Sequence, residues 1–440
     1  MSETARVRTQ TVVAVWVMVL LFGGQGFRYS SGLVGYSILV GVTFIGFLWV
    51  FLERWNWKQT PVLLAMFLSW AAISVFWSAT PVVTFIATII LLMTSVAAVI
   101  TASKYTWTGF LKLLWVALTV VMVLSFGLEL YAACVGGVHP VFTDLAELAD
   151  QKTNWWWSEG NLFLNGPLQG WTGNRNLFAF LGLLYAAANI FLMLERKIHW
   201  LVGTVGLLVS AVVQLNAMSA TITIIYAAVA FILIAGFLLR RTPEKRKRLT
   251  ATCIAGAGVL LGVIILRYQD TLFMFLERDP SLSNRTAIWL RVIEFALQRP
   301  EGWGWVSYWP VWEYPYNTLV DVDILPVAHA HNAYLDVWFQ LGLIGVLLIV
   351  GMLVQLLVIN WRGVEHSHKG ETYRTLGLFV FTIILAVQGL TESRLLLEGN
   401  WFLFAALLTY TPWKASKHSK LVTASRRADN TEHHDRANKQ

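Results

Sequence analysis

The strongest constraint on this chain is the recurrence of continuous apolar runs, each near the length that crosses a lipid bilayer. A membrane-spanning helix needs about 20 apolar residues. Runs of this kind lie at 10–27, 33–52, 61–77, 82–102, 110–134, 176–194, 199–215, 218–239, 249–267, 333–359, 375–391 and 396–412. Because the runs do not alternate in polarity as barrel strands do, the sequence predicts an all-α, polytopic membrane protein with about twelve transmembrane helices.

Composition and charge agree with this interpretation. Charged residues make up 13% of the chain, whereas a soluble domain has about 25%. The net charge of +8 arises from basic residues in alternate loops, most densely in RRTPEKRKR at 240–248. Because cytoplasmic loops are rich in Lys and Arg, we expect both termini in the cytoplasm and a multi-pass protein of the inner or cytoplasmic membrane. The basic run then anchors to the lipid surface, and no nucleic-acid partner is expected.

The apolar runs divide the chain into six segments. These are five helices in 1–134, an extracytoplasmic loop at 135–175, four helices in 176–267, a large extracytoplasmic loop at 268–332, three helices in 333–412 and a basic cytoplasmic tail at 413–440. Loops carried on a rigid scaffold often hold binding and catalytic groups. We therefore expect the functional site in the two long outer loops, the later of which is the candidate catalytic loop.

The later loop contains an amphipathic sequence, RTAIWLRVIEFALQ at 285–298. Its period predicts a helix that rests its apolar face on the bilayer surface. That face comprises Ile288, Trp289, Val292, Ile293 and Ala296. Arg285 is placed just before the helix, behind Ser283 and Asn284 as possible N-caps.

Tryptophans are abundant in both outer loops. Trp156 lies in the run NWWW at 154–157, and Trp303 and Trp305 lie in GWGW at 302–305. Aromatic rings of this kind stack on sugar rings. They also form belts at membrane interfaces or fill a folded lid. For Trp156, sugar stacking and an interfacial belt both stay open, and for Trp303 and Trp305, sugar stacking and a folded lid both stay open.

His331 begins the tenth apolar run. A lone histidine at a helix start is often only a cap, but His329 lies two residues away and Asn332 is placed to orient the ring. Histidine changes charge near neutral pH, which suits a general base. Cys134 and Cys253 without clustered histidines give no metal signature, so we predict neither a metal nor another cofactor.

Four strings resemble motifs of the O-antigen ligase and polymerase superfamily, membrane enzymes that transfer lipid-linked glycans. They are GWTGNRNLFA at 170–179, SNRTAIW at 283–289, RPEGWGW at 299–305 and HNAYLDVWFQLG at 331–342. The resemblance spans the core from about Gly170 to Gly345. It implies a metal-independent, inverting transfer from an undecaprenyl-diphosphate-linked glycan to a hydroxyl of a glycan, lipid or protein acceptor.

The resemblance also implies site residues. Arg285 matches the arginine of the late loop and His331 the histidine of the His-Asn motif, so both are predicted to be catalytic. Arg285, Arg291 and Arg175 are predicted to bind the diphosphate, since guanidinium groups bind phosphate oxygens as a planar fork. The Ser-Arg that such proteins commonly carry near the eighth span is replaced by Met218-Ser219-Ala220-Thr221-Ile222. Arg175 is a candidate for the missing charge.

Three functions stay open from the sequence. A ligase moves a finished glycan to a different acceptor, and a polymerase joins one lipid-linked repeat to another; we take the ligase-like transferase as the first hypothesis. A transporter of lipid-linked oligosaccharides would carry ionisable groups inside its spans, where this chain has few, Glu129 among them. His331 itself has two possible roles, general base or diphosphate ligand.

Overall fold

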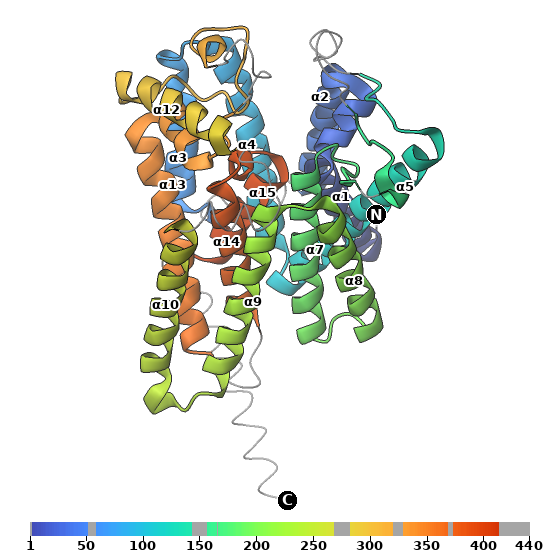
Figure 1. Cartoon of the computed structure of the whole chain (residues 1–440), viewed down its shortest axis with the longest axis vertical. Helices are drawn as coiled ribbons and strands as arrows, with labels where there is room; N and C mark the ends of the chain where they lie inside the picture. The colour runs from blue at the N-terminus through green and yellow to red at the C-terminus, as the bar shows by residue number, and fades with distance from the viewer. Residues whose placement is uncertain are drawn as a thin grey trace, which may run out of the picture.

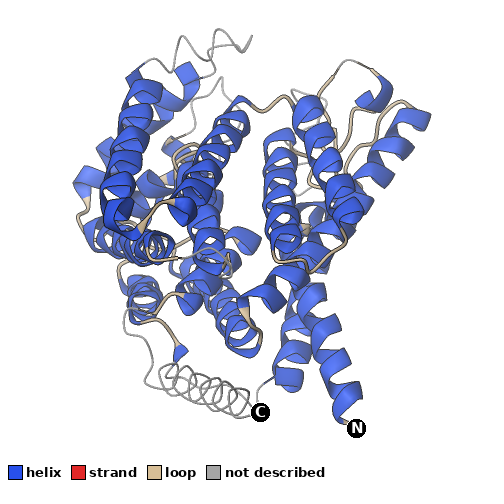
Figure 2. Ribbon diagram, turned by 90° about the horizontal axis from the view of Figure 1, so that it is seen from below, coloured by secondary structure: helices blue, strands red, loops and turns tan. Residues whose placement is uncertain are grey.

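The computed structural model describes residues 2–51, 59–142, 156–164, 166–267, 282–319, 329–367 and 373–412. Within these residues the chain forms helices joined by loops, and its only β-structure is a single bridge between Val138 and Ser158 (Figure 2). The helices, with η for 3-10 helices, are α1 (Glu3–Phe22), α2 (Gly24–Phe51), α3 (Val62–Ile73), η3 (Ser74–Phe76), α4 (Pro81–Lys104), α5 (Trp107–Val135), η4 (Asn161–Phe163), α7 (Arg175–Leu194), α8 (Trp200–Ala217), α9 (Ala220–Arg241), α10 (Glu244–Arg267), α12 (Leu282–Gln298), η5 (Tyr316–Thr318), α13 (Ala333–Glu365), α14 (Arg374–Gly389), η6 (Ser393–Leu396) and α15 (Glu398–Tyr410). The predicted tail at 413–440 lies outside the described residues.

The all-α membrane fold predicted from the apolar runs is confirmed, and a helix occupies each of the twelve predicted ranges. In the part of the chain that is described, nine helices are long and apolar enough to cross a membrane: α1, α2, α4, α5, α7, α8, α9, α10 and α13. The remaining three, α3, α14 and α15, are shorter. Almost every residue of α15 is buried, and so are Ser393, Leu395 and Leu396 of the segment before it. Protein therefore shields this irregular stretch, as non-helical chain at membrane depth requires.

The last two helices occupy the middle of the molecule. Figure 1 shows α14 and α15 in the centre beside α4, with α3, α12 and α13 on one side and α1, α5, α7 and α8 on the other. Trp401 of α15 fixes the central packing, since its Nε1 donates to Ser95 Oγ of α4 at 2.8 Å and its ring lies 5.2 Å from that of Phe67. The start of α15, and with it the preceding turn, is thereby held against α3 and α4.

The predicted amphipathic helix is present as α12, with two differences. It begins at Leu282, so Arg285 lies within its first turn rather than ahead of it. Its apolar side packs into the protein: Ile288, Val292 and Phe295 are buried in a cluster with Phe339 of α13 and with aromatic residues of the following loop. The helix therefore does not rest this face on the bilayer, because the loop that follows it folds back and covers the face.

The first turns of α13 hold that loop in place. The Asp336 carboxylate accepts hydrogen bonds from Trp309 Nε1 at 2.8 Å, from the backbone N–H of Ala330 at 3.2 Å and from Gln340 Nε2 at 3.1 Å. Gln340 Oε1 in turn accepts from the backbone N–H of Val306 at 2.9 Å. These buried polar groups are thus satisfied by the loop, which fixes its path relative to the start of α13.

The backbone at 300–303 also passes very close to the backbone of α13. Trp303 N–H donates to Phe339 O at 2.9 Å, and Leu343 N–H donates to Pro300 O at 3.1 Å. This approach is possible because α13 is kinked at Gly342, whose φ is +62°. A Cβ at Gly342 would lie 1.9 Å from Pro300 O.

Gly342→Ala is therefore expected to destabilise the fold. The left-handed backbone and the clash with Pro300 together reduce the free energy of unfolding by about 2 kcal/mol or more. The measurement is the thermal unfolding midpoint of the detergent-purified protein. Gly351→Ala is the control on the same helix, since a Cβ there meets only Leu63 at an ordinary 3.6 Å. Equal midpoints for the two variants would contradict this account of the crossing.

Candidate functional site

A polar cavity of about 110 Å³ lies where several distant parts of the chain meet. Its walls come from the starts of α7, α9 and α12, from the segment before α13 and from the turn after α14. The lining residues are Asn174, Asn176, Leu177, Ser219, Thr221, Ile222, Arg285, His329, His331, Gln388, Thr391, Glu392 and Arg394. The two predicted catalytic residues, Arg285 and His331, are thus brought into one cavity.

Glu392 joins those two residues. Arg285 Nη2 donates to Glu392 Oε1 at 3.2 Å, and His331 Nδ1 lies 3.1 Å from Glu392 Oε2. Each carboxylate oxygen therefore has its own partner. The Glu392 side chain is 16% exposed and that of Arg285 22%, so solvent screens this pair less than it would a pair on an open surface.

The charge state of Glu392 determines the tautomer of His331. Burial opposes ionisation of Glu392, but the hydrogen bond from His331 and the positive charge of Arg285 lower its pKa to about 2. An ionised carboxylate only accepts hydrogen bonds. His331 Nδ1 must therefore carry the hydrogen, which leaves Nε2 of a neutral ring as the proton acceptor.

His329 lies beside this pair as a neutral ring. Burial, reinforced by the neighbouring positive charges of Arg394 and Arg285, lowers the pKa of His329 to about 3. Its Nδ1 accepts the backbone N–H of His331 at 3.2 Å, and the two rings meet edge-on with centroids 4.2 Å apart. His329 thus supports the segment that carries His331 without adding charge.

The backbone of His331 is held in an unusual conformation, with a φ of +50°. Such left-handed geometry is costly for a non-glycine residue and persists where the surroundings impose it. Asn332 imposes it from one side, since its Oδ1 caps α13 by accepting from Tyr334 N and Leu335 N while its Nδ2 donates to Leu390 O at 3.2 Å. Asn332 therefore fixes the backbone of His331, whereas Glu392, rather than Asn332, orients its ring.

The other predicted site residues lie elsewhere. Arg175 is exposed at the start of α7, and Arg291, 60% exposed, pairs with Glu294 at 3.2 Å. Neither is among the described residues that line the cavity. Binding of the diphosphate by these two arginines stays a prediction, and it would have to take place outside this cavity.

The three candidate sugar-stacking tryptophans are engaged with the protein. Trp303 is 4% exposed and Trp305 0%, so neither presents a ring face to a ligand in this conformation. Trp156 stacks on His139 with ring centroids 3.8 Å apart. The interpretation as a folded lid fits Trp303 and Trp305 better, and stacking on a sugar stays a prediction for Trp156.

Two charged residues of the cavity, Glu392 and Arg394, were not singled out by the sequence analysis. They lie in the short turn TESR at 391–394, between the last two apolar runs. The available signal was the presence of opposite charges in a turn of that length on the predicted outer side. His329, Glu392 and His331 also place ligand atoms within 4.8 Å of one another, a grouping capable of holding a metal ion that the cysteine count did not indicate.

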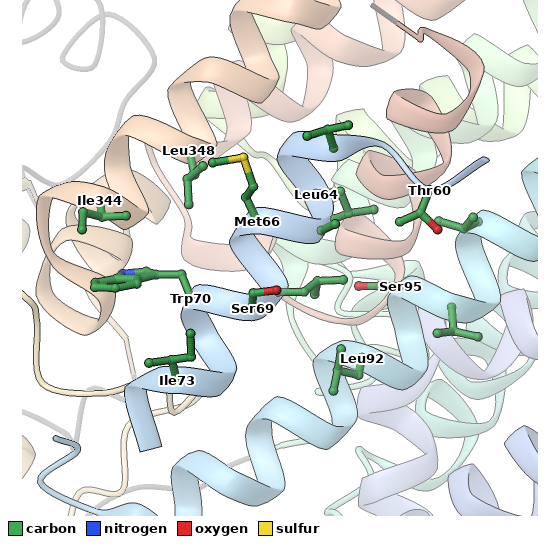
Figure 3. Close-up of a pocket in the computed structure, with 15 residues that line it drawn as sticks. Thr60, Leu64, Met66, Ser69, Trp70, Ile73, Leu92, Ser95, Ile344 and Leu348 are labelled. Atoms are coloured by element: carbon green, nitrogen blue, oxygen red, sulfur yellow. The ribbon is translucent and has the colours of Figure 1, made fainter. Parts of the chain in front are cut away.

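A second, larger hollow of about 850 Å³ lies between α3, α4 and α13 (Figure 3). Its labelled side chains include Met66, Trp70, Leu92, Ile344 and Leu348. None of the described residues that line it is ionisable. This hollow suits hydrocarbon, and the groups capable of acid–base chemistry gather in the smaller cavity.

Comparison with known proteins agrees with the motifs. Residues 205–350 match the family model described as O-antigen ligase, a segment that includes Arg285 and His331 but ends before Glu392. The chain is also 28% identical over 190 residues to the exopolysaccharide production protein ExoQ of Rhizobium meliloti (strain 1021), covering 40% of this chain and 42% of that protein. The matched part is thus less than half of the curated relative. Together with the polytopic helical fold, these matches show that the chain is similar to the O-antigen ligase and polymerase superfamily of polysaccharide-biosynthesis proteins.

Proposed function

We propose that the cavity transfers a glycan from a polyprenyl diphosphate, of the undecaprenyl type, to an acceptor hydroxyl. The observation that carries this proposal is the convergence of Arg285 and His331 on Glu392. Breaking a sugar–phosphate bond requires stabilisation of the charge that develops on the leaving diphosphate, and removal of a proton from the attacking hydroxyl. The cavity has a guanidinium for the first requirement and an imidazole for the second.

His331 acts as the general base in this proposal. Its Nε2 takes the proton from the acceptor hydroxyl as the hydroxyl oxygen forms a bond to the anomeric carbon. Glu392, on Nδ1, stabilises the imidazolium that results, as the carboxylate of a Ser-His-Asp triad does. The fixed Nδ1 contact favours the base over the alternative in which His331 only binds phosphate.

Arg285 stabilises the leaving group. The bond between the anomeric carbon and the diphosphate oxygen breaks with its electron pair left on the diphosphate. Only one of the five guanidinium N–H groups of Arg285 is needed for Glu392, so the others stay available for phosphate oxygens. Attack from the face opposite the diphosphate makes the transfer inverting.

The reaction is proposed on the extracytoplasmic side. The parts of the chain that line the cavity fall at the outer ends of the predicted spans, including the end of the 135–175 loop, the 268–332 loop and the turn at 391–394. A hydroxyl of a glycan, lipid or protein outside the membrane is then within reach. Ligase and polymerase share this step, and they differ only in which molecule carries the hydroxyl.

No metal ion is required in this proposal. His329, His331 and Glu392 are close enough to ligate one, but Arg285 and Arg394 line the same cavity. A divalent cation would meet two fixed positive charges there, whereas a diphosphate would be attracted by both. The charge of the cavity therefore favours the anionic substrate.

Arg285→Ala and His331→Ala are each expected to reduce glycan transfer at least about 100-fold while the protein is produced and inserted normally. The assay uses proteoliposomes supplied with one lipid-linked repeat, with and without a second acceptor. Chain growth from the single repeat indicates a polymerase, and dependence on the second acceptor a ligase. Arg362→Ala, an exposed arginine near the other end of α13, is the control. Full activity of either site variant would refute the assignment.

Transfer is expected to continue unchanged in excess EDTA, because charge stabilisation comes from arginine. The same proteoliposome assay measures the rate before and after chelation. A loss of rate that added Mg²⁺ or Zn²⁺ restores would overturn the metal-independent step and point to the His329, His331 and Glu392 grouping instead.

The neutral state of His329 predicts a pH dependence of stability. Its pKa is lowered from 6.5 to about 3 on folding, so the unfolded chain binds a proton that the folded protein excludes. Stability contributed this way is complete above pH 6.5 and is lost as the pH falls from 6.5 toward 3. Glu392, with its ordinary value of 4.5, does not titrate above about pH 5 in either state.

The unfolding midpoint of the wild type is therefore expected to fall between pH 7 and pH 5, and His329→Gln is expected to flatten that fall. His366→Gln, which changes an exposed histidine near the end of α13, is the matched control. Parallel curves for wild type and His329→Gln would show that His329 is not held neutral by the fold.

A further inference from the structure

Arg394 is a second cation in the proposed transfer cavity, and no carboxylate of the described residues forms an ion pair with it. It lines the cavity together with Arg285. The oxygens of nearby Glu392 are taken by Arg285 and His331, and Arg394 makes no ion pair with any described residue. Its positive charge is also one of those that lower the pKa of His329. An uncompensated, half-buried guanidinium at the wall of a cavity is a binding group for an anion.

Tyr308 orients Arg394. Arg394 Nη1 donates to Tyr308 Oη at 2.7 Å, and Arg394 Cζ lies 5.9 Å from the centre of the Tyr308 ring. Tyr308 belongs to the loop that Asp336 and Gln340 fix against α13. The position of the Arg394 guanidinium is thus set by the same scaffold that carries His331.

Arg28 of α2 holds the other side of this arrangement. Arg28 Cζ lies 5.2 Å from the centre of the same Tyr308 ring, while its guanidinium is ion-paired with Glu398. Glu398, like His331, has a left-handed backbone, with a φ of +46°. Because the charge of Arg28 is compensated by Glu398, it packs on Tyr308 without competing for the anion that Arg394 attracts.

The wall at the start of α9 adds to the positive potential. Ser219 gives α9 no side-chain cap, since its Oγ contacts Asn176 Oδ1 at 3.0 Å instead. The free first-turn amides of a helix favour negative charge, and Ser219, Thr221 and Ile222 line the cavity. This is the stretch where the superfamily motif has an arginine that the present chain lacks.

We infer that Arg394 binds the second phosphate of the donor. Arg285 holds one phosphate beside His331, Arg394 holds the other, and Tyr308 is the positioning residue that fixes Arg394. The inference rests on the proposed transfer function and extends it, because it makes the site selective for a diphosphate over a monophosphate. Arg394 thereby supplies the charge for which Arg175 was the sequence candidate.

The test compares two soluble probes, geranylgeranyl diphosphate and geranylgeranyl monophosphate, for binding to the full-length protein in detergent. The wild type is expected to bind the diphosphate at least about tenfold more tightly, the size expected of one charge-assisted contact. Arg394→Ala and Arg394→Gln are expected to abolish this preference by weakening diphosphate binding alone. Arg285→Ala weakens binding of both probes, and Arg362→Ala neither.

Tyr308→Phe separates positioning from folding. It keeps the ring on which Arg28 and Arg394 lie but removes the oxygen that Arg394 binds. The KM for the lipid-linked donor is expected to rise about fivefold with kcat little changed, and the unfolding midpoint is expected to stay at that of the wild type.

The outcomes distinguish the inference from the function beneath it. Retention of the diphosphate preference in both Arg394 variants overturns the role of Arg394, while transfer that depends on Arg285 and His331 would leave the proposed function intact. A wild type that binds neither probe and transfers no glycan overturns both. If Arg394→Ala fails to fold, Arg394→Gln and Tyr308→Phe decide.

Discussion

The site depends on one carboxylate, Glu392, that is shared between a guanidinium and an imidazole. Charges are tolerated away from water only when they are paired, and here Arg285 and His331 pair with separate oxygens of the same group. This pairing fixes which atoms of the two side chains are available to a substrate. Because the carboxylate is ionised, it fixes the hydrogen on Nδ1 of His331 and leaves Nε2 to face the reaction, and it holds Arg285 by one N–H while the rest of the fork stays free. Removing this carboxylate would leave the Arg285 guanidinium unpaired and the His331 ring without a fixed tautomer.

The start of α13 gives that interaction its rigidity. The left-handed backbone at His331 would relax in an isolated loop, since a strained residue persists only where its surroundings over-determine it. Here the Asn332 cap holds it from the helix side, and Asp336 holds it through the backbone of Ala330. Asp336 also binds Trp309 of the outer loop. One turn of helix therefore fixes both the proposed base and the loop above it, which is the pre-organisation that a proton transfer requires.

The membrane helices were predictable because the thickness of the bilayer core sets the length of each apolar run independently of the others. A helix is found at every predicted range. The amphipathic period of α12 was equally local, and it identified Ile288 and Val292 as its apolar side. What covers that side was not predictable, because a bilayer and a folded loop present the same apolar surface to a helix. Trp303 and Trp305 show the same limit of sequence analysis. The sequence of an outer loop does not reveal whether its aromatic residues face a sugar or, as these two do, the protein interior.

The charged half of the site escaped sequence analysis for a different reason. Glu392 and Arg394 lie in a four-residue turn, TESR at 391–394, that looks like any polar connection between two spans. Their significance arises only when α14 and α15 fold into the centre of the molecule and carry the turn next to the start of α13. Charges brought in from a distant turn also explain why the absence of an arginine at 218–222 does not predict weak binding of an anion. An anion responds to the summed potential of the cavity. In the proposed site, the guanidinium of Arg394 and the first-turn amides of α9 therefore take the part of the one missing side chain.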